Sequence, residues 1–202
     1  MRRFSTRTLI ATASAALAAM LLVAGGLLLW GSAYVHNTVQ GQLAAQQITF
    51  PPASAFAHPK AGGEITPSMI PSVSQYAGQQ LLTGQQAEAY ADHFIAVHIQ
   101  NMAGGKTYSQ LSAAALAQPS NTQLAGQVAT VFKGETLRSM LLNAYGWWKV
   151  SQITYIISLV AFGLGTVAGL GSIFLFATGR KNKGDAPVPP AGHETISPVQ
   201  TA

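Results

Sequence analysis

The apolar run from Ile153 to Thr178 constrains this chain more than any other stretch. No charged residue occurs between Lys149 and Arg180, which leaves 30 consecutive uncharged residues. A helix needs only about 20 apolar residues to cross the hydrocarbon core of a bilayer. We therefore predict a transmembrane helix over residues 153–179, ended on its basic side by Arg180 and Lys181.

A second uncharged run, from Leu9 to Tyr34, follows the basic N-terminal residues 1–8. One interpretation is a cleaved signal peptide, with Gly31, Ser32 and Ala33 as the small-residue cleavage site. The run is longer than the roughly 7 to 15 apolar residues of a typical signal, so we favour an uncleaved signal-anchor helix over residues 9–35. Both interpretations export the residues after about position 36.

Basic residues flank both apolar runs, and their placement predicts the orientation in the membrane. The flanking residues are Arg2, Arg3 and Arg7 on one side and Arg180, Lys181 and Lys183 on the other. Lys and Arg flanks stay in the cytoplasm, so we expect a plasma-membrane protein with both termini cytoplasmic and residues 36–152 forming an extracytoplasmic domain. The net charge of +5 then belongs to these flanks, and the expected partner is membrane lipid and not nucleic acid.

The predicted extracytoplasmic domain is helical apart from one proline-rich segment. Residues 36–47 can prolong the first helix as a polar stalk, whereas residues 49–71 contain five prolines and predict an irregular crossing. A helix over residues 83–102 is indicated by the capping-box spacing of Thr83 and Gln86 and by the terminating pair Gly104 and Gly105. Its apolar face is predicted to comprise Ala87, Tyr90, Ala91, Phe94, Val97 and His98.

Two further helices are expected before the membrane. One covers residues 108–117 and stops at Pro119, and another starts at Asn121 or Thr122. Because no proline lies between Glu135 and Ile153, a single helix is expected from about Thr136 to Thr178. Its face of Leu137, Leu141, Ala144 and Trp148 would pack on helix 83–102. The tail, residues 180–202, is rich in proline and small polar residues and predicts disorder. The fold class is thus an all-α membrane protein with two transmembrane helices and a helical extracytoplasmic domain between them.

Small residues recur every fourth position on both predicted spans. These stripes are Ala161, Gly165 and Gly169 on the second span and Ala11, Ala15 and Ala19 on the first. Small residues let helix backbones approach closely in lipid, where apolar surfaces alone do not drive association. The stripes therefore predict helix packing, either between the two helices of this chain or with a membrane-protein partner or second copy. Gly163 and Gly171 flank the second stripe, so both kinds of packing are compatible.

Aromatic residues mark the expected membrane boundaries. They are Trp30 and Tyr34 at the end of the first span, and Tyr145, Trp147 and Trp148 with Lys149 before the second. Trp and Tyr favour the interface between hydrocarbon and water. We interpret these residues, together with Arg180 and Lys181, as interfacial anchors; a quinone or lipid-headgroup site is the alternative for the cluster around Trp148.

Catalytic and metal-binding patterns are missing from the sequence. There is no cysteine, no HExxH metal motif and no GxSxG nucleophile elbow. His93 and His98, with Glu88 and Asp92 nearby, were the best metal candidates, but residues five apart on a helix diverge by about 140°. We expect neither a cofactor nor an enzymatic activity.

Two segments, AEAYADHFIAVHIQNMAGGKTYSQL and ETLRSMLLNAYGWWKVSQI, and the glycine-rich last span resemble a group of actinobacterial two-span membrane proteins of unknown function. The resemblance covers roughly residues 80–178 and implies two spans around an extracytoplasmic helical loop. Some relatives with a similar GGKTY element carry an automatic label of aromatic ring-opening dioxygenase. That label implies an iron site, for which the histidine spacing supplies no ligand set.

The sequence favours a structural or accessory interaction subunit of the cell envelope. The alternative is an extracytoplasmic ligand-binding or enzymatic domain anchored by two helices.

Overall fold

The structure, a computed structural model, describes residues 6–61 and 63–184. Every regular element in these ranges is helical, and the only β-type contact among them is an isolated antiparallel bridge between Thr49 and Gln80. The all-α prediction is confirmed for this part of the chain. Two helical stretches, Thr6–Ala45 and Thr122–Thr178, are long and apolar enough to cross a membrane. The tail after Gly184 and the basic residues Arg2 and Arg3 lie outside the described residues.

The chain divides into two compact units. The terminal unit comprises Met1–Ala24 and Ala161–Ala202, and the central unit comprises Gly25–Val160. The terminal unit thus contains the first part of one long helix and the last part of another. The central unit contains everything between them in sequence.

The first long helix, α1 (Thr6–Ala45), contains the predicted span and continues beyond His36, as the stalk prediction requires. Backbone N–H groups of Gln46 and Gln47 donate to the carbonyls of Leu43 and Ala44. Gln47 then adopts a left-handed φ of 53°. This conformation is uncommon outside glycine and ends the helix.

The proline-rich segment after α1 folds into single turns. These are η1 (Ala53–Phe56), η2 (Pro67–Met69), α2 (Ile70–Val73) and η3 (Ser74–Tyr76). The predicted irregular crossing is therefore confirmed, and we call residues 48–82 the irregular arm. Phe50, Met69, Val73 and Leu81 are fully buried, so the arm supplies much of the core of the central unit.

The next helix runs continuously through three pieces. They are α3 (Gly84–Tyr90), the π-helical turn η4 (Ala91–Ile95) and α4 (Ala96–Met102). The predicted capping box is present: the backbone N–H of Gln86 donates to the Thr83 hydroxyl at 3.2 Å, and the Thr83 N–H donates to the Gln86 side chain at 3.0 Å. Gly104 and Gly105 have φ values of 58° and 76° and end the helix as predicted.

The π turn changes which face of this helix is buried. The buried residues recur every fourth position: Ala87, Ala91, Ile95, Ile99 and Ala103. In a regular α-helix this spacing would drift by about 40° per step, and the wider turn at η4 offsets that drift. Of the predicted face, Ala87 and Ala91 are buried, and Tyr90, Phe94 and Val97 are half-buried and pack against the core. The prediction omitted Ile95 and Ile99, which are buried.

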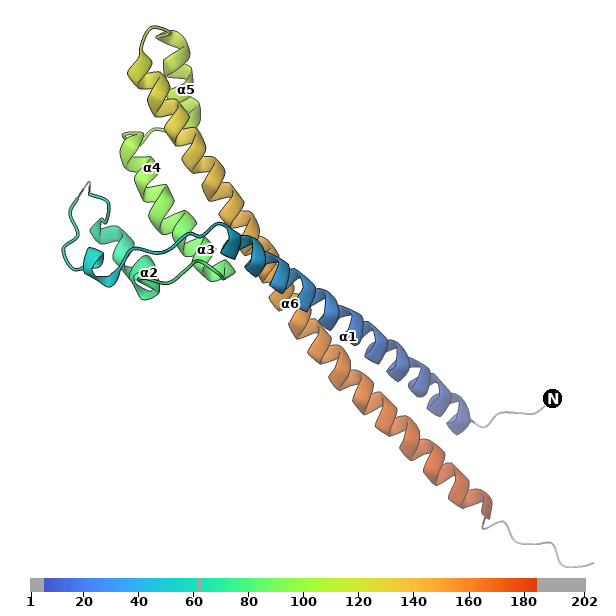
Figure 1. The fold of residues 1–202 in the computed structure, drawn as a ribbon. Coiled ribbons are helices and arrows are strands. Elements are labelled where there is room, and N and C mark those ends of the chain that lie inside the picture. Colours follow the sequence, from blue (N-terminus) through green and yellow to red (C-terminus); the bar gives the residue numbers. More distant parts are fainter. Residues whose placement is uncertain (1–5, 62, 185–202) are drawn as a thin grey trace, which may run out of the picture. The chain divides into compact units, whose positions relative to one another are not determined.

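Helix α5 (Tyr108–Ala117) has the predicted bounds and begins with a second capping box, formed by Thr107 and Gln110. In Figure 1, α5 folds back beside the first part of α6 (Thr122–Gly184). The rings of Tyr108 and Phe132 lie 5.6 Å apart between these two helices.

Helix α6 begins earlier than the expected start of the long helix near Thr136. The Asn121 side chain accepts a hydrogen bond from the backbone N–H of Leu124 at 3.0 Å, which caps the helix, and no proline interrupts it afterwards. The predicted third helix and the second span are therefore one element. On its packing face Leu141 and Trp148 are buried and Ala144 is half-buried, but Leu137 is 37% exposed.

Candidate functional site

In the terminal unit, α1 and α6 pack against each other through small residues. A Cβ atom added to Gly165 would lie 3.1 Å from Cγ of Leu22, and one added to Gly169 would lie 3.7 Å from the Ala18 Cβ. The Ser172 hydroxyl donates to the carbonyl oxygen of Ala11 at 2.8 Å. Of the two packing alternatives predicted from the stripes, this unit therefore shows the pairing of the chain's own two helices.

Along both helices, one set of buried residues recurs at every seventh position. They are Ala11, Ala18, Gly25, Ser32 and Val39 on α1, and Ser151, Ser158, Gly165 and Ser172 on α6. We call this double row the seam. A spacing of seven is the period of left-handed helix pairs. Of the predicted stripes, Ala11, Ala161 and Gly165 are buried, Ala15 and Gly169 are half-buried, and Ala19 is exposed.

In the central unit, the seam contains a second hydrogen bond from a serine to the opposite backbone. The Ser32 hydroxyl on α1 donates to the Ser151 carbonyl on α6 at 2.7 Å, and the Ser151 hydroxyl donates to the carbonyl of Trp148 in its own helix at 2.7 Å. A buried hydroxyl without a partner costs free energy, and more so in hydrocarbon. These serines are therefore satisfied parts of the packing and not free nucleophiles.

Trp148 lies in the core of the central unit, which differs from the predicted interfacial position. Its side chain is 5% exposed. A Cβ added to Gly84, the first residue of α3, would clash with Cβ and Cγ of Trp148. On another side of the indole lies the His36 ring: the two ring centroids are 4.0 Å apart, and the ring planes are inclined by 35°. Trp148 thus joins α1, α3 and α6 and is not available to lipid.

The other predicted anchors have exposed or partly exposed side chains. Trp30 and Tyr34 stack with ring centroids 5.8 Å apart and are 69% and 62% exposed. Trp147 is 53% exposed, and the Lys149 ammonium lies 5.6 Å from the centre of the Tyr145 ring. Their interfacial role stays a prediction. The side chains of Arg180 and Lys181 lie outside the described residues.

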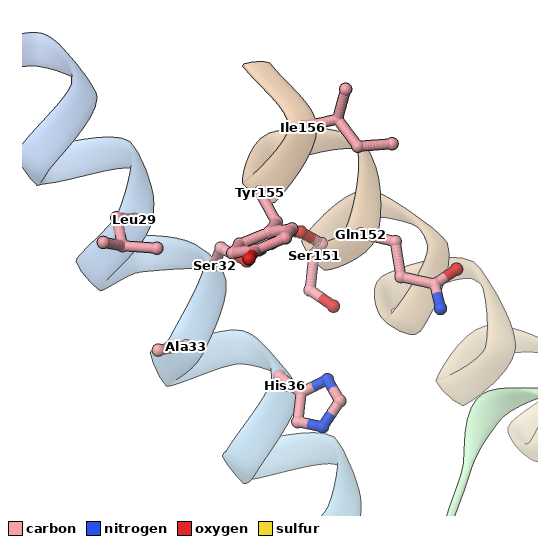
Figure 2. A pocket seen from close by; sticks show the side chains of 8 residues that line it. All are labelled: Leu29, Ser32, Ala33, His36, Ser151, Gln152, Tyr155 and Ile156. Atoms are coloured by element: carbon pink, nitrogen blue, oxygen red, sulfur yellow. Dashed lines mark hydrogen bonds between the residues drawn. The ribbon is translucent and has the colours of Figure 1, made fainter. Parts of the chain in front are cut away.

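A crevice between α1 and α6 in the central unit has room for a small ligand (Figure 2). Its volume is about 540 Å³, and it is lined by Leu29, Ser32, Ala33 and His36 from α1 and by Ser151, Gln152, Tyr155 and Ile156 from α6. Cavities of about 300 to 1,000 Å³ with a few polar groups are typical of small-molecule sites. No charged side chain lines this crevice.

The polar groups of the crevice differ in whether they have partners. Ser32 and Ser151 are hydrogen-bonded within the seam. Among residues 6–61 and 63–184, His36, Gln152 and Tyr155 have no hydrogen-bond partner for their side chains, and the buried indole N–H of Trp148 also lacks an acceptor. Figure 2 shows the His36 and Tyr155 rings between the two helices, with Gln152 at the margin.

A charged cluster lies elsewhere in the central unit, at the π turn. Arg138 donates to Asp92 at 2.8 Å, and it approaches the Glu135 carboxylate at 3.5 Å. The hydrogen bond to Asp92 raises the pKa of Arg138 above its usual value. All three side chains are about one-third or more exposed, so the cluster is a partly solvated ion pair of small net stabilisation.

His93 lies in the π turn η4 and His98 in the following helix α4. His98 Nδ1 lies 2.8 Å from the Phe94 carbonyl oxygen of its own helix. No group of three or more His, Cys, Asp or Glu side chains suited to a metal ion occurs within the described part of the chain.

Comparison of the chain with family models, curated proteins and solved structures gives no match. The resemblance to two-span membrane proteins therefore stays a prediction, and the site must be interpreted from its own chemistry.

Three features of the site were not foreseen from the sequence: the seven-residue seam, the burial of Trp148 and the crevice. The seam could have been predicted from the sequence, because Ser151, Ser158, Gly165 and Ser172 follow one another at intervals of seven. The crevice had none, since its residues come from segments more than a hundred positions apart in sequence.

Proposed function

We propose that this chain is a plasma-membrane protein with two spans, cytoplasmic termini and an exported domain over residues 36–152, and that it acts as a non-catalytic accessory subunit of the cell envelope. The charge flanks of the sequence support the orientation. The extent of exposed apolar surface on both long helices supports the membrane placement: Leu17, Val23, Val167 and Ile173 are each more than half exposed.

The observation that carries the interaction role is a small-residue face on α6 that the seam leaves unused. Gly163 and Gly171 each have open space around a potential Cβ, and they lie one turn to either side of Val167, which is 71% exposed. Close approach over such residues is the usual basis of helix association in lipid. The space beside Gly165, by contrast, is already filled by the Leu22 side chain of α1. The chain therefore pairs its own helices on one side and offers α6 to a membrane-protein partner or a second copy on the other.

The proposal is tested by substituting Gly163 and Gly171 together with Leu in the full chain. We expect this variant to lose co-purifying subunits or its own higher assembly in mild detergent, because two added side chains hold a partner helix away. Its melting temperature should stay close to that of the native chain, since neither glycine contacts the seam. Mass spectrometry and light scattering of material from native membranes provide the measurement.

The matched control places leucines at Ala16 and Ala24, exposed small residues on α1 that are also eight positions apart. This control should keep the assembly. Unchanged assembly in the Gly163 and Gly171 variant, or equal loss in both variants, would contradict the proposed role of the α6 face.

A further inference from the structure

We propose that the crevice between α1 and α6 binds an uncharged amphiphile, whose oxygen-bearing head lies near His36 and Gln152 and whose hydrocarbon chain extends past Leu29 and Ile156. This site goes beyond the proposed accessory role, which needs only the outer face of α6. Either function can therefore fail without the other.

The first argument is the polarity gradient along the crevice. On α1, Leu29 is followed two turns later by His36, a rise of about 10 Å. On α6, which runs in the opposite direction along the seam, Ile156 is preceded by Gln152 and Ser151. The apolar end of the crevice thus points along both helices toward their uncharged spanning segments, and the polar end points away. An amphiphile at a bilayer boundary has the same arrangement of tail and head.

The second argument is the surplus of hydrogen-bond donors at the polar end. The Gln152 amide and one imidazole nitrogen of His36 can each donate, and neither has an acceptor among the described residues. Carbonyl, ester or hydroxyl oxygens of a ligand head would supply the missing acceptors.

The third argument is the absence of charge. Sites for phosphate or carboxylate groups normally contain Arg or Lys, and sites for ammonium groups contain carboxylates or aromatic cages. Neither Lys, Arg, Asp nor Glu lines this crevice. A phospholipid headgroup or a cationic amphiphile is therefore disfavoured relative to a neutral molecule.

The experiment measures the melting temperature of the full chain in mild detergent against increasing probe concentration. Two neutral probes are used: dioctanoylglycerol, with ester and hydroxyl oxygens, and decylubiquinone, with ring carbonyls. Dioctanoylphosphatidylglycerol is the anionic counterpart, and dodecane is the counterpart without oxygen. We expect at least one neutral probe to raise the melting temperature by about 5 to 10 °C at roughly 100 times its Kd, and the better probe identifies the kind of head. The anionic and oxygen-free probes should give much smaller shifts.

Two variants test the position of the site. Replacing His36 and Gln152 together with Leu should weaken binding of the neutral probe roughly 10- to 100-fold, as expected for two lost hydrogen bonds. Ala33→Phe should abolish binding by filling the crevice. The matched control replaces Asn37 and Gln40 with Leu; both are exposed polar residues of α1 outside the crevice. This control should bind the neutral probe as the native chain does. The proposal is overturned if neither neutral probe shifts the native chain, if the anionic or oxygen-free probe shifts it equally, or if Ala33→Phe responds like the native protein.

Discussion

At the scale of single residues, the contact between Gly84 and Trp148 explains most about the central unit. An indole side chain would ordinarily be expected at a membrane boundary, yet here it is covered by the first turn of α3 and by His36. Glycine is required at position 84 because the indole and its Cβ occupy the volume that any side chain would fill. Trp148 Cβ is fixed to the α6 backbone, so it cannot move aside without shifting the helix.

We expect Gly84→Ala to destabilise the protein by about 1 to 3 kcal/mol or more, the usual cost of overpacking a core. Gly146→Ala is the control: nothing lies within 4 Å of its potential Cβ, and alanine in a helix interior is favoured over glycine by roughly 0.5 to 1 kcal/mol. Chemical denaturation of the full chain in detergent measures both. Equal stability of the two variants would show that Trp148 does not pack against α3 as described.

At the scale of elements, the helices fixed by nearby residues could be predicted, whereas the features that depend on distant contacts could not. Helices 84–102 and 108–117 could be predicted because capping residues, prolines and glycines act within a few positions of where they stand. The π turn and the folding of the irregular arm could not be predicted, because both depend on contacts made across the central unit. Phe50 and Met69, for example, lie in proline-rich sequence without helical periodicity and are nevertheless fully buried.

The docking of the irregular arm on α3 should depend on pH through Tyr90. Its ring lies 5.3 Å from that of Phe50, and its pKa is raised above the usual value of about 10, first by burial and second by the charge of Glu64. A pKa raised in the folded state means that the contribution to stability is complete below about pH 10 and is lost as the pH rises through the folded-state pKa.

We therefore expect the melting temperature to fall above pH 10, and Tyr90→Phe to remove that component because phenylalanine does not ionise. Tyr108→Phe removes a hydroxyl from α5 instead and should keep the alkaline loss. Thermal melting between pH 8 and pH 11 decides between these outcomes, and an identical pH profile for native protein and Tyr90→Phe would rule out this role of Tyr90.

At the scale of the whole molecule, the sequence establishes more about placement than about activity. The two long apolar helices were predictable from uncharged runs alone, and the structure agrees with them. The seven-residue seam was not predicted, because alanine is so frequent on α1 that spacings of four and of seven coexist there. The crevice could not be predicted from the sequence, since no local pattern links His36 to Gln152.

The proposed orientation can be measured directly, because the chain contains no cysteine. Gln75→Cys places one thiol on an exposed position of the irregular arm, and it should react with a membrane-impermeant maleimide in intact cells. Gly192→Cys, near the C-terminus, should react only after the cells are opened. The reverse labelling pattern would invert the orientation, and labelling of both in intact cells would exclude two cytoplasmic termini.

The π turn at Ala91–Ile95 has an evolutionary consequence. It holds one residue more than an α-helical turn would need, so it is the place in this helix where a single-residue insertion or deletion changes least. A homologue lacking that residue would keep Ala87 and Ile99 equivalents on the buried side only if its gap were placed inside 91–95. Sequence alignments that move such a gap into the neighbouring loops would rotate half of the helix out of register.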